Sequence, residues 1–464
     1  MAGKFERSRK KRRGSILIIP AVLLVVCAAA FAIRMHTEKM DPPQQENDKS
    51  QQTDIVMTQV PAAPTETEPT EPAPVVKEST ATIGATGDLL FHDLVIKSGY
   101  DSESESYNYD NIFKWFSAYV SEVDYAAANL EVTLAGDDNG YRYSGYPCFN
   151  SPDAIVDAAK AAGFDLLLTA NNHTYDTQFT GFTRTQQVID ERGLDHIGTR
   201  LEVEDKNYIV RNINGINIAM TCYTYSTGYT GAGNFMLNGI PLSDEASQLI
   251  NAFHYQDLDT FYNKLAGEME QMKADGAEAV VLFIHWGKEY KTTYNDTQKQ
   301  MAQALCNLGI DVIVGNHAHV AQPVELLSSE TDDTHRTLCL YSTGNSVSNI
   351  FREEGFPAHT EDGMLFTFTF AKYSDGTVLV ESADVLPTWV WRYIDENGVR
   401  KFQILTMDHE AEKWQETMGL TDQLLDKCQE SYDRTMEVVG EGLRTANDWY
   451  AQRQEQTEIV FGIR

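Results

Sequence analysis

Two histidines, His317 and His319, stand one residue apart in the stretch GNHAHVAQPVE, directly after an apolar run at 312–314. Imidazole binds transition metals and transfers protons near neutral pH, and a buried polar group normally has a partner. Alternate residues of a strand point to the same side, so this spacing predicts that both rings face one site. A single histidine at a strand end is most often structural, so the prediction depends on how the other strands end.

Five further apolar runs also end in polar side chains. The residues concerned are Asp88 and His92, Asn129 and Glu131, Asn172 and His173, His285 and Glu289, and Ser342 and Asn345. Short, continuous apolar runs predict strands that are buried on both faces. Amphipathic stretches separate several of these runs, and this alternation predicts an α/β fold with helices on both sides of a sheet. Ligands of such sheets bind beyond the carboxyl ends of the strands, so we expect these polar groups to share one rim.

Helix boundaries are predicted by residues with known positional preferences. Ser151 is expected to be an N-cap, with Pro152 at the first helical position and Gly163 after the last turn. Gly309 is expected to end a second helix over 294–309. These helices would connect the strands that bear the polar groups.

The predicted rim has the composition of a metal site. It combines two carboxylates, one amide oxygen and three imidazoles, from Asp88, Glu131, Asn172, His285, His317 and His319. Oxygen and imidazole ligands without thiolate suit Mn, Fe or Zn better than Ca. The number of ligands is sufficient for two divalent metal ions bridged by a carboxylate, an arrangement that hydrolyses phosphate esters.

Six motifs in a fixed order give the chain a family resemblance. From about Ile83 to about Asn349 they read GDLLFHD, NLEVTL, NNHTYD, HWGKEY, GNHAHVAQPVE and YSTGNSVSN, with a weaker continuation to about residue 395. Together they resemble the capsule synthesis protein CapA family, which includes components of poly-γ-glutamate synthesis. The resemblance implies a calcineurin-like metallophosphoesterase domain over residues 81–400, with a four-layer α/β/β/α sandwich and a dinuclear metal site.

The resemblance also implies a role for each polar residue. It implies that Asp88 and His319 bind the first metal ion, that Glu131 bridges the two ions, and that Asn172, His285 and His317 bind the second. His173 is implied to be the catalytic acid that protonates the leaving oxygen.

Three further residues are candidates for supporting roles. His92 is a candidate extra ligand of the first metal ion, Glu289 a candidate acceptor that orients an imidazole, and Asn345 a residue that lines the rim. Ordinary phosphoesterases begin with D-x-H, whereas His92 follows Asp88 by four residues. Glu131 is one methylene longer than the aspartate that usually bridges the metals. Both departures bear on how many metal ions the site binds and on whether it is catalytically competent.

The N-terminal part predicts a membrane protein. Residues 1–14 contain seven basic residues against one acid and predict a cytoplasmic leader. Ser15–Ile33 has no charge and can span the bilayer core as a helix, so residues 15–35 predict a single-pass anchor with the main domain extracytoplasmic. A cleaved signal peptide is the alternative, although no small-x-small site follows the apolar run. Residues 36–80, rich in Pro, Thr, Glu and Gln, predict a disordered linker.

The charge of the chain is strongly asymmetric. The net charge is −31, and because the leader contributes +6, the remainder carries −37. Nucleic-acid binding is not expected, because it requires a basic surface. Six scattered cysteines without a CxxC pair predict no disulfide framework. Residues 401–464 predict a helical, acidic extension that packs on the core, and the segment 225–234 is either a loop over the site or a plain connection.

Three functions are compatible with these features. The first is a membrane-anchored component of capsule or other envelope polymer biosynthesis or export, working with a polymer synthase complex and an anionic polymer of the poly-γ-glutamate type. The second is an extracytoplasmic metal-dependent phosphoesterase, or another hydrolase, that acts on a different envelope substrate. The third is a binding module with a vestigial metal site.

Overall fold

The computed structural model describes residues 75–138, 140–231 and 233–460. The predicted leader, the predicted membrane anchor and the predicted linker up to residue 74 lie outside the described residues. Within the described ranges, no helix is both long and apolar enough to cross a membrane. The first described strand, β1, begins at Lys77, four residues before the predicted start of the folded domain.

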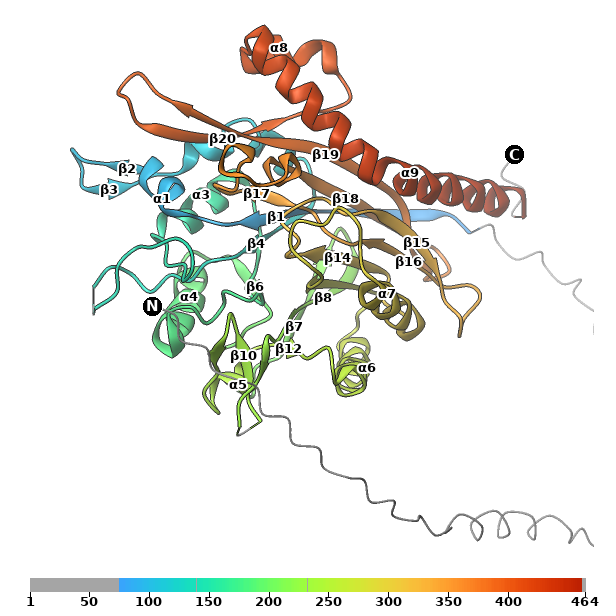
Figure 1. The fold of residues 1–464 in the computed structure, drawn as a ribbon. Coiled ribbons are helices and arrows are strands. Elements are labelled where there is room, and N and C mark those ends of the chain that lie inside the picture. The colour runs from blue at the N-terminus through green and yellow to red at the C-terminus, as the bar shows by residue number, and fades with distance from the viewer. Residues whose placement is uncertain (1–74, 139, 232, 461–464) are drawn as a thin grey trace, which may run out of the picture. The chain divides into compact units, whose positions relative to one another are not determined.

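The larger of the two main sheets is mixed and has eight strands (Figure 1). Its order is β20–β19–β18–β1–β4–β5–β6, and β17 pairs with β1. β1, β4, β5 and β6 are parallel, whereas β18, β19 and β20 are antiparallel to their neighbours. The strands are β1 (Lys77–Leu89), β4 (Tyr125–Leu130), β5 (Leu166–Leu168), β6 (Asp195–Ile197), β17 (Asn345–Val347), β18 (Asp362–Tyr373), β19 (Val378–Ile394) and β20 (Arg400–Thr406).

The second main sheet has seven strands in the order β12–β8–β13–β14–β16–β15, with β7 paired to β8. Its central pairs are parallel, and β7 and β15 are antiparallel to their neighbours. The strands are β7 (Tyr208–Ile213), β8 (Ile216–Tyr225), β12 (Ala252–Phe253), β13 (Ala279–His285), β14 (Val312–Asn316), β15 (Val324–Ser328) and β16 (Arg336–Leu340).

Shorter elements complete the described chain. A three-stranded sheet contains β9 (Gly228–Tyr229), β10 (Phe235–Leu237) and β11 (Ile240–Pro241), and a hairpin contains β2 (Tyr100–Asp101) and β3 (Ser106–Tyr107). The helices are α1 (Asp93–Ser98), α2 (Ser117–Val120), α3 (Ala154–Ala162), α4 (Gln178–Glu191), α5 (Ala246–Leu249), α6 (Leu258–Ala274), α7 (Asp296–Leu308), α8 (Trp414–Met418) and α9 (Asp422–Val460). The 3₁₀ turns are η1 (Asp110–Phe113), η2 (Arg352–Glu354), η3 (Ala358–Glu361) and η4 (Ala411–Lys413).

The main hydrophobic core contains side chains from both main sheets, among them Phe366 of β18 and Val281 of β13. Alternation along β4 directs Ala127 into this core and Ala126 into a second core that includes residues of α3 and α4. A third core packs α6 and α7 against the second sheet, for example through Leu265 and Leu305. The protein is therefore a mixed α/β protein, as the alternation of apolar runs predicts.

The start of α3 differs from the prediction. The helix begins after Asp153, which makes no side-chain capping hydrogen bond, so the prediction of Ser151 as N-cap is wrong. Ser151 instead donates its backbone N–H to the carbonyl oxygen of Thr133, which binds it to the segment after β4. The predicted helix ends are confirmed, because Gly163 and Gly309 follow α3 and α7 with φ of 102° and 93°.

The prediction of a helical extension from residue 401 is wrong at its start, because residues up to Thr406 belong to β20, which pairs with β19, and the helices α8 and α9 come later. The long helix α9 lies beside β19 and β15 (Figure 1). Its side chains Val439, Leu443 and Tyr450 belong to the main core. Arg434 of α9 also donates two hydrogen bonds, at 2.7 and 2.6 Å, to the buried Asp362 of β18. The predicted packing of this segment on the core is confirmed.

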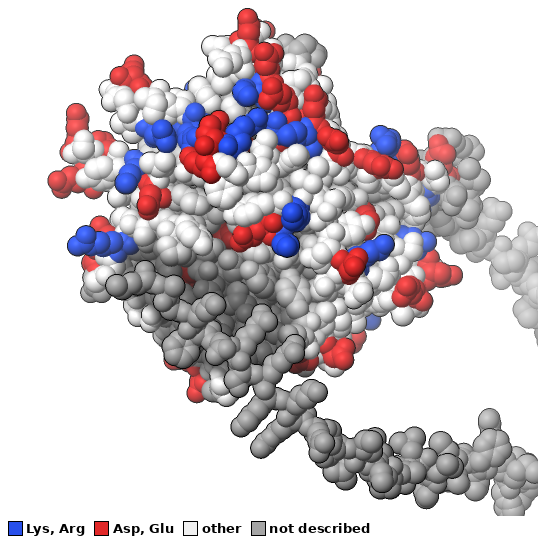
Figure 2. Space-filling view, viewed as in Figure 1, with Lys and Arg blue, Asp and Glu red and all other residues white. Residues whose placement is uncertain are grey.

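Charged side chains are mixed on the face seen in Figure 2, where lysines and arginines lie among aspartates and glutamates. Arg392, for example, pairs with both Glu353 and Glu354. The five cysteines in the described part of the chain are free thiols, as predicted.

Candidate metal centre

The predicted metal ligands come from both main sheets and lie together. All six are buried. β1, β4 and β5 of the first sheet, and β13 and β14 of the second, end beside one another, and the ligands lie at or just beyond these ends: Asp88, Glu131, Asn172, His285, His317 and His319.

Two overlapping groups of these side chains have the spacing of a metal site. Glu131, His285 and His317 form one group, and Asp88, Glu131 and His319 form the other. In each group the candidate ligand atoms all lie within 4.8 Å of one another. Glu131 belongs to both groups, and the sequence resemblance assigns it the bridging position.

Hydrogen bonds within the protein cannot satisfy all the polar atoms that surround the Nε2 atom of His285. Its Nε2 lies 2.7 Å from Asn172 Oδ1, 3.1 Å from His317 Nδ1 and 3.4 Å from Glu131 Oε1. One ring N–H can serve only one of these three acceptors, and Glu131 Oε1 has no hydrogen-bond partner among the described residues. A buried acceptor without a partner costs free energy. A cation at this position could be bound by a lone pair from each of the four atoms, namely His285 Nε2 and its three neighbours. The residues present therefore fit a metal ion.

The second group is organised around Asp88. His319 Nδ1 lies 3.0 Å from Asp88 Oδ2 and 3.1 Å from Asn345 Oδ1. Asn129 donates to the other carboxylate oxygen of Asp88 at 2.7 Å. Asn345 also donates to the backbone carbonyl of His319 at 3.2 Å, so it binds both the ring and the backbone of this residue.

The prediction that His317 and His319 are alternate residues of a strand is wrong, because both lie in the turn after β14, which ends at Asn316. Their φ angles are 92° and 55°, in the left-handed region that non-glycine residues rarely adopt. Such strained residues concentrate at functional sites. The two rings do face one site, with centroids 6.1 Å apart, but the turn directs them there.

His173 lies in the loop after β5, next to the ligand Asn172. Its Nδ1 is 2.7 Å from Asp176 Oδ2, and Phe149 packs edge-on against its ring at 4.7 Å. The same Asp176 oxygen accepts the backbone N–H of Phe149 at 2.7 Å. Because Nδ1–H is donated to Asp176, the Nε2 atom is the one left for a substrate.

The two remaining candidates lie at the edge of the site. The Nδ1 atom of His92 accepts the backbone N–H of Asn349 at 3.3 Å, and its ring contacts Phe149 at 5.1 Å. His92 belongs to neither of the two ligand groups found among the described residues. Glu289 is exposed.

Burial lowers the pKa of His319, but the hydrogen bond and charge of Asp88 and the charge of Glu289 together raise it above its ordinary value.

Electrostatics favour the metal-binding forms of two of the three imidazoles, His285 and His317. Burial lowers the pKa of His285 to about 3 and lowers the pKa of His317 well below its ordinary value. Both rings are therefore neutral at pH 7 and keep a lone pair for a metal ion. Burial raises the pKa of Glu131, and the nearby charge of Asp88 raises it further. Two buried carboxylates this close need a compensating cation to be ionised together.

A close backbone contact places Asp88 at the site. Gly87 precedes it, and a Cβ atom on Gly87 would lie 1.9 Å from the carbonyl oxygen of Gly344. Only glycine lets β1 approach this segment so closely, and the Asp88 N–H then donates to the same carbonyl at 3.2 Å.

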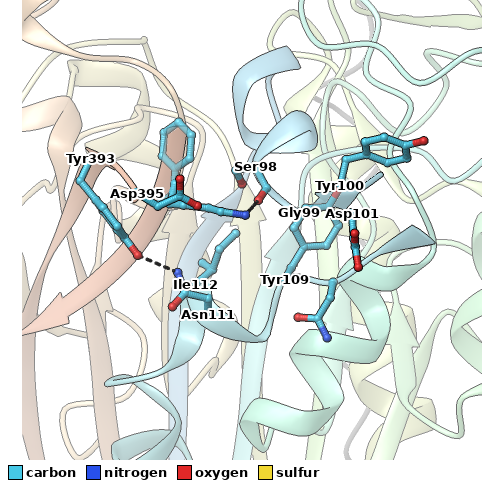
Figure 3. A pocket seen from close by; sticks show the side chains of 12 residues that line it. Ser98, Gly99, Tyr100, Asp101, Tyr109, Asn111, Ile112, Tyr393 and Asp395 are labelled. Atoms are coloured by element: carbon cyan, nitrogen blue, oxygen red, sulfur yellow. Dashed lines mark hydrogen bonds between the residues drawn. The ribbon is translucent and has the colours of Figure 1, made fainter. Parts of the chain in front are cut away.

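A separate hollow of about 350 Å³ lies between the β2–β3 hairpin, η1 and the β19–β20 hairpin (Figure 3). Several of its polar side chains already have partners within the protein: Asn111 donates to Tyr393, Lys401 donates to the carbonyl of Ser98, and Asp395 accepts two backbone N–H groups. Such satisfied groups stabilise the hairpins, so this hollow is a weaker candidate for a functional site.

The structure adds several residues to the site for which the sequence analysis predicted no role. Asp176, three residues after His173, binds its ring, and Asn129 binds Asp88. Tyr225, at the end of β8, packs on His317 with ring centroids 4.7 Å apart. The polar residues after the apolar runs include Asp176 and Asn129, but only the fold shows which ligand each one contacts.

The fold and this cluster define a class: a mixed α/β protein with a candidate metal centre where the carboxyl ends of two sheets meet. Residues 82–350, more than half of the chain, match the family described as "Bacterial capsule synthesis protein PGA_cap". The chain therefore belongs to this family, and the predicted resemblance is confirmed.

Two curated relatives are similar to this chain over part of its length. The chain is 28% identical over 284 residues to a protein of Bacillus anthracis named "Capsule biosynthesis protein CapA", covering 61% of this chain and 62% of the relative. It is 25% identical over 295 residues to the "PGA biosynthesis protein CapA" of Bacillus subtilis (strain 168), covering 63% of this chain and 70% of the relative. The match thus spans less than two thirds of the length of the Bacillus anthracis protein.

Proposed function

We propose that the protein is a membrane-anchored, extracytoplasmic component of capsule or poly-γ-glutamate-type polymer biosynthesis or export. The family and the names of both relatives support a role in capsule synthesis. The uncharged segment Ser15–Ile33 and the basic leader support the anchor and its orientation. A polymer synthase or export complex at the membrane and an anionic polymer are the partners that this role requires.

The centre is proposed to bind two divalent ions, of Mn, Fe or Zn, with Glu131 shared between them. The fold is proposed to be the four-layer α/β/β/α sandwich of metallophosphoesterases. The shared core of the two sheets and the helices packed on their other faces support this assignment. Metal ions bound here would generate a hydroxide nucleophile and polarise the scissile group.

The residues of the chain would perform the remaining steps. His173 would transfer its proton from Nε2 to the leaving oxygen while Asp176 accepts the Nδ1–H bond and stabilises the charged ring. Asn345 would fix the ring of His319, and Tyr225 would confine the ring of His317. This supports a second candidate function, an active hydrolase of an envelope phosphoester, because the polymer role alone does not require an acid beside the ligands.

The observation behind the metal proposal is the set of three acceptors around His285 Nε2. The test is elemental analysis of the full-length protein, purified without chelator, together with its His317→Ala and His409→Ala variants. His409 is an exposed histidine far along the chain and serves as the matched control. We expect about two metal ions per chain in the wild type and the control, and a loss of metal in His317→Ala.

Two results would decide against the proposal. Absence of metal in the wild type after incubation with Mn, Fe and Zn would exclude the metal centre. Deletion of the gene in its own organism without any change in surface polymer would exclude the biosynthetic role. Metal retained without hydrolysis of any phosphodiester would favour the binding module with a vestigial site.

A further inference from the structure

The small three-stranded sheet contributes a side chain to the candidate site. β10 and β11 are joined by Asn238 and Gly239, with φ of 47° and 73°. Two consecutive residues with positive φ form the tight hairpin turn in which asparagine followed by glycine is preferred. Asn238 is therefore at the tip of a hairpin that belongs to neither main sheet.

The amide of Asn238 joins two segments beside His173. Its Nδ2 donates to Asp176 Oδ1 at 2.9 Å and to the carbonyl oxygen of Pro147 at 2.9 Å. These two bonds use both amide protons. The contact of 3.4 Å between Asn238 Nδ2 and His173 Nδ1 is therefore not a hydrogen bond, because the His173 proton is already donated to Asp176.

Asp176 consequently has donors on both carboxylate oxygens. Oδ2 accepts from the Phe149 N–H and from His173 Nδ1, each at 2.7 Å, and Oδ1 accepts from Asn238. Without Asn238, Oδ1 would lose this fixed donor and the carboxylate could rotate about its χ2 angle. Its rotation would release the His173 ring from its tautomer and direction.

The hairpin is packed onto the chain segment that contains His173. Leu237, directly before Asn238, shares a hydrophobic cluster with Tyr175 and with Phe182 of α4. The position of the amide is therefore set by a buried contact and by the turn geometry. A residue so constrained can position its partner precisely enough for proton transfer.

We infer that Asn238 is a positioning residue for His173, and that the hairpin of β10 and β11 is part of the active site. It acts through Asp176 and does not touch the metal ligands. The inference deepens the proposed hydrolase function and rests on His173 being its acid. It predicts that the hairpin affects the protonation of the leaving group and leaves metal binding unchanged.

Two substitutions of Asn238 preserve the turn, because glycine and aspartate both tolerate positive φ. Asn238→Gly removes the amide, and Asn238→Asp replaces the donor by a carboxylate facing Asp176. Asn234→Gly is the matched control, since Asn234 directly precedes β10 and its side chain hydrogen-bonds to Asp244 and to the carbonyl of Leu242 instead. The full-length proteins, loaded with Zn, are compared in the hydrolysis of bis(p-nitrophenyl) phosphate and diphenyl phosphate.

Loss of a positioned acid should affect only the poorer leaving group. We expect kcat for diphenyl phosphate to fall about tenfold or more in both Asn238 variants, which is part of the roughly 10²–10⁴-fold that general acid catalysis contributes. We expect less than a twofold change for the nitrophenyl ester, unchanged Zn content, and wild-type behaviour in Asn234→Gly. Equal loss on both esters, or loss of Zn, would assign Asn238 a merely structural role and overturn the inference.

An NMR measurement separates this inference from the proposed function. The Nδ1 proton of His173, assigned with a His173→Asn variant, should give a downfield signal in the wild type and lose it in Asn238→Gly. If neither ester is hydrolysed by the wild type, the hydrolase function fails, and this signal alone decides the positioning role. An unchanged signal in Asn238→Gly would overturn the inference whatever the activity.

Discussion

Gly442 is predicted to be indispensable for the packing of α9, whereas its neighbour Gly440 in the same helix is not. A Cβ atom on Gly442 would lie 1.7 Å from the carbonyl oxygen of Val324 in β15, where ordinary contact begins at 3.4 Å. A backbone oxygen cannot rotate away as a side chain can. The helix and the strand would have to separate by about 1.7 Å, which disturbs the core contacts of Val439 and Leu443.

The expected magnitudes follow from two opposing effects. Overpacking of this kind costs about 3 kcal/mol, the upper end of the usual range, because the obstacle is backbone. Replacing a helical glycine by alanine contributes about 1 kcal/mol in the other direction. Gly442→Ala should therefore destabilise the protein by about 2 kcal/mol. Gly440→Ala should stabilise it by up to about 1 kcal/mol, because its nearest neighbour is the flexible end of Met436 at 3.5 Å.

The assay is urea unfolding of the full-length variants, followed by tryptophan fluorescence and circular dichroism. The midpoint should fall for Gly442→Ala and stay or rise for Gly440→Ala, with similar slopes. A Gly442→Ala protein as stable as Gly440→Ala would refute the close contact between α9 and β15. It would also remove the basis for treating α9 as an integral part of the folded domain.

Three further substitutions test other parts of the structure. Arg434→Met would leave Asp362 buried without its two-point partner, so we expect a loss of about 3–5 kcal/mol in urea unfolding, and a loss below about 1 kcal/mol would contradict a buried pair. Burial raises the pKa of Asp195, but the hydrogen bonds from Arg211 and Tyr125 and the charge of Arg211 together lower it below its ordinary value. The carboxylate therefore stabilises the fold above about pH 4, and that stabilisation disappears as the pH falls further. Asp195→Asn should be less stable than the wild type at pH 7, and the difference should shrink as the pH falls below about 4. A difference in stability that is independent of pH would be inconsistent with this assignment. Gly87→Ala would place its Cβ 1.9 Å from a carbonyl oxygen beside Asp88, so we expect a folded protein with reduced metal content, and full metal content would argue against the contact.

The residue types of the candidate site could be predicted because the chemistry of a side chain and the apolar run before it are both visible within a short stretch of sequence. The carboxylates, amides and imidazoles follow apolar runs, and the carboxyl ends of buried parallel strands meet at one edge. Asp88, Glu131 and His285 confirm this reasoning, since each lies at or just after a strand end. The resemblance to a family could be stated for the same reason, because its motifs are short and contiguous.

Other features could not be derived from local patterns. The histidine pair was expected in a strand, but His317 and His319 lie in a strained turn whose backbone is determined by its surroundings. Ser151 has the residue type of an N-cap, yet its backbone pairs with Thr133 instead, and the helix begins later. Propensities are weak where a tertiary hydrogen bond competes with them.

The sequence by itself determined the mixed α/β class and the types of side chain that lie at the candidate metal centre, because hydrophobic periodicity and side-chain chemistry can be read from each residue and its neighbours. The anchor before residue 75 stays a prediction. Only the tertiary structure decided which oxygen faces which imidazole, that Asn238 reaches Asp176, and that α9 joins the main core. Those contacts join segments tens or hundreds of residues apart, and their geometry depends on the packing of both sheets at once.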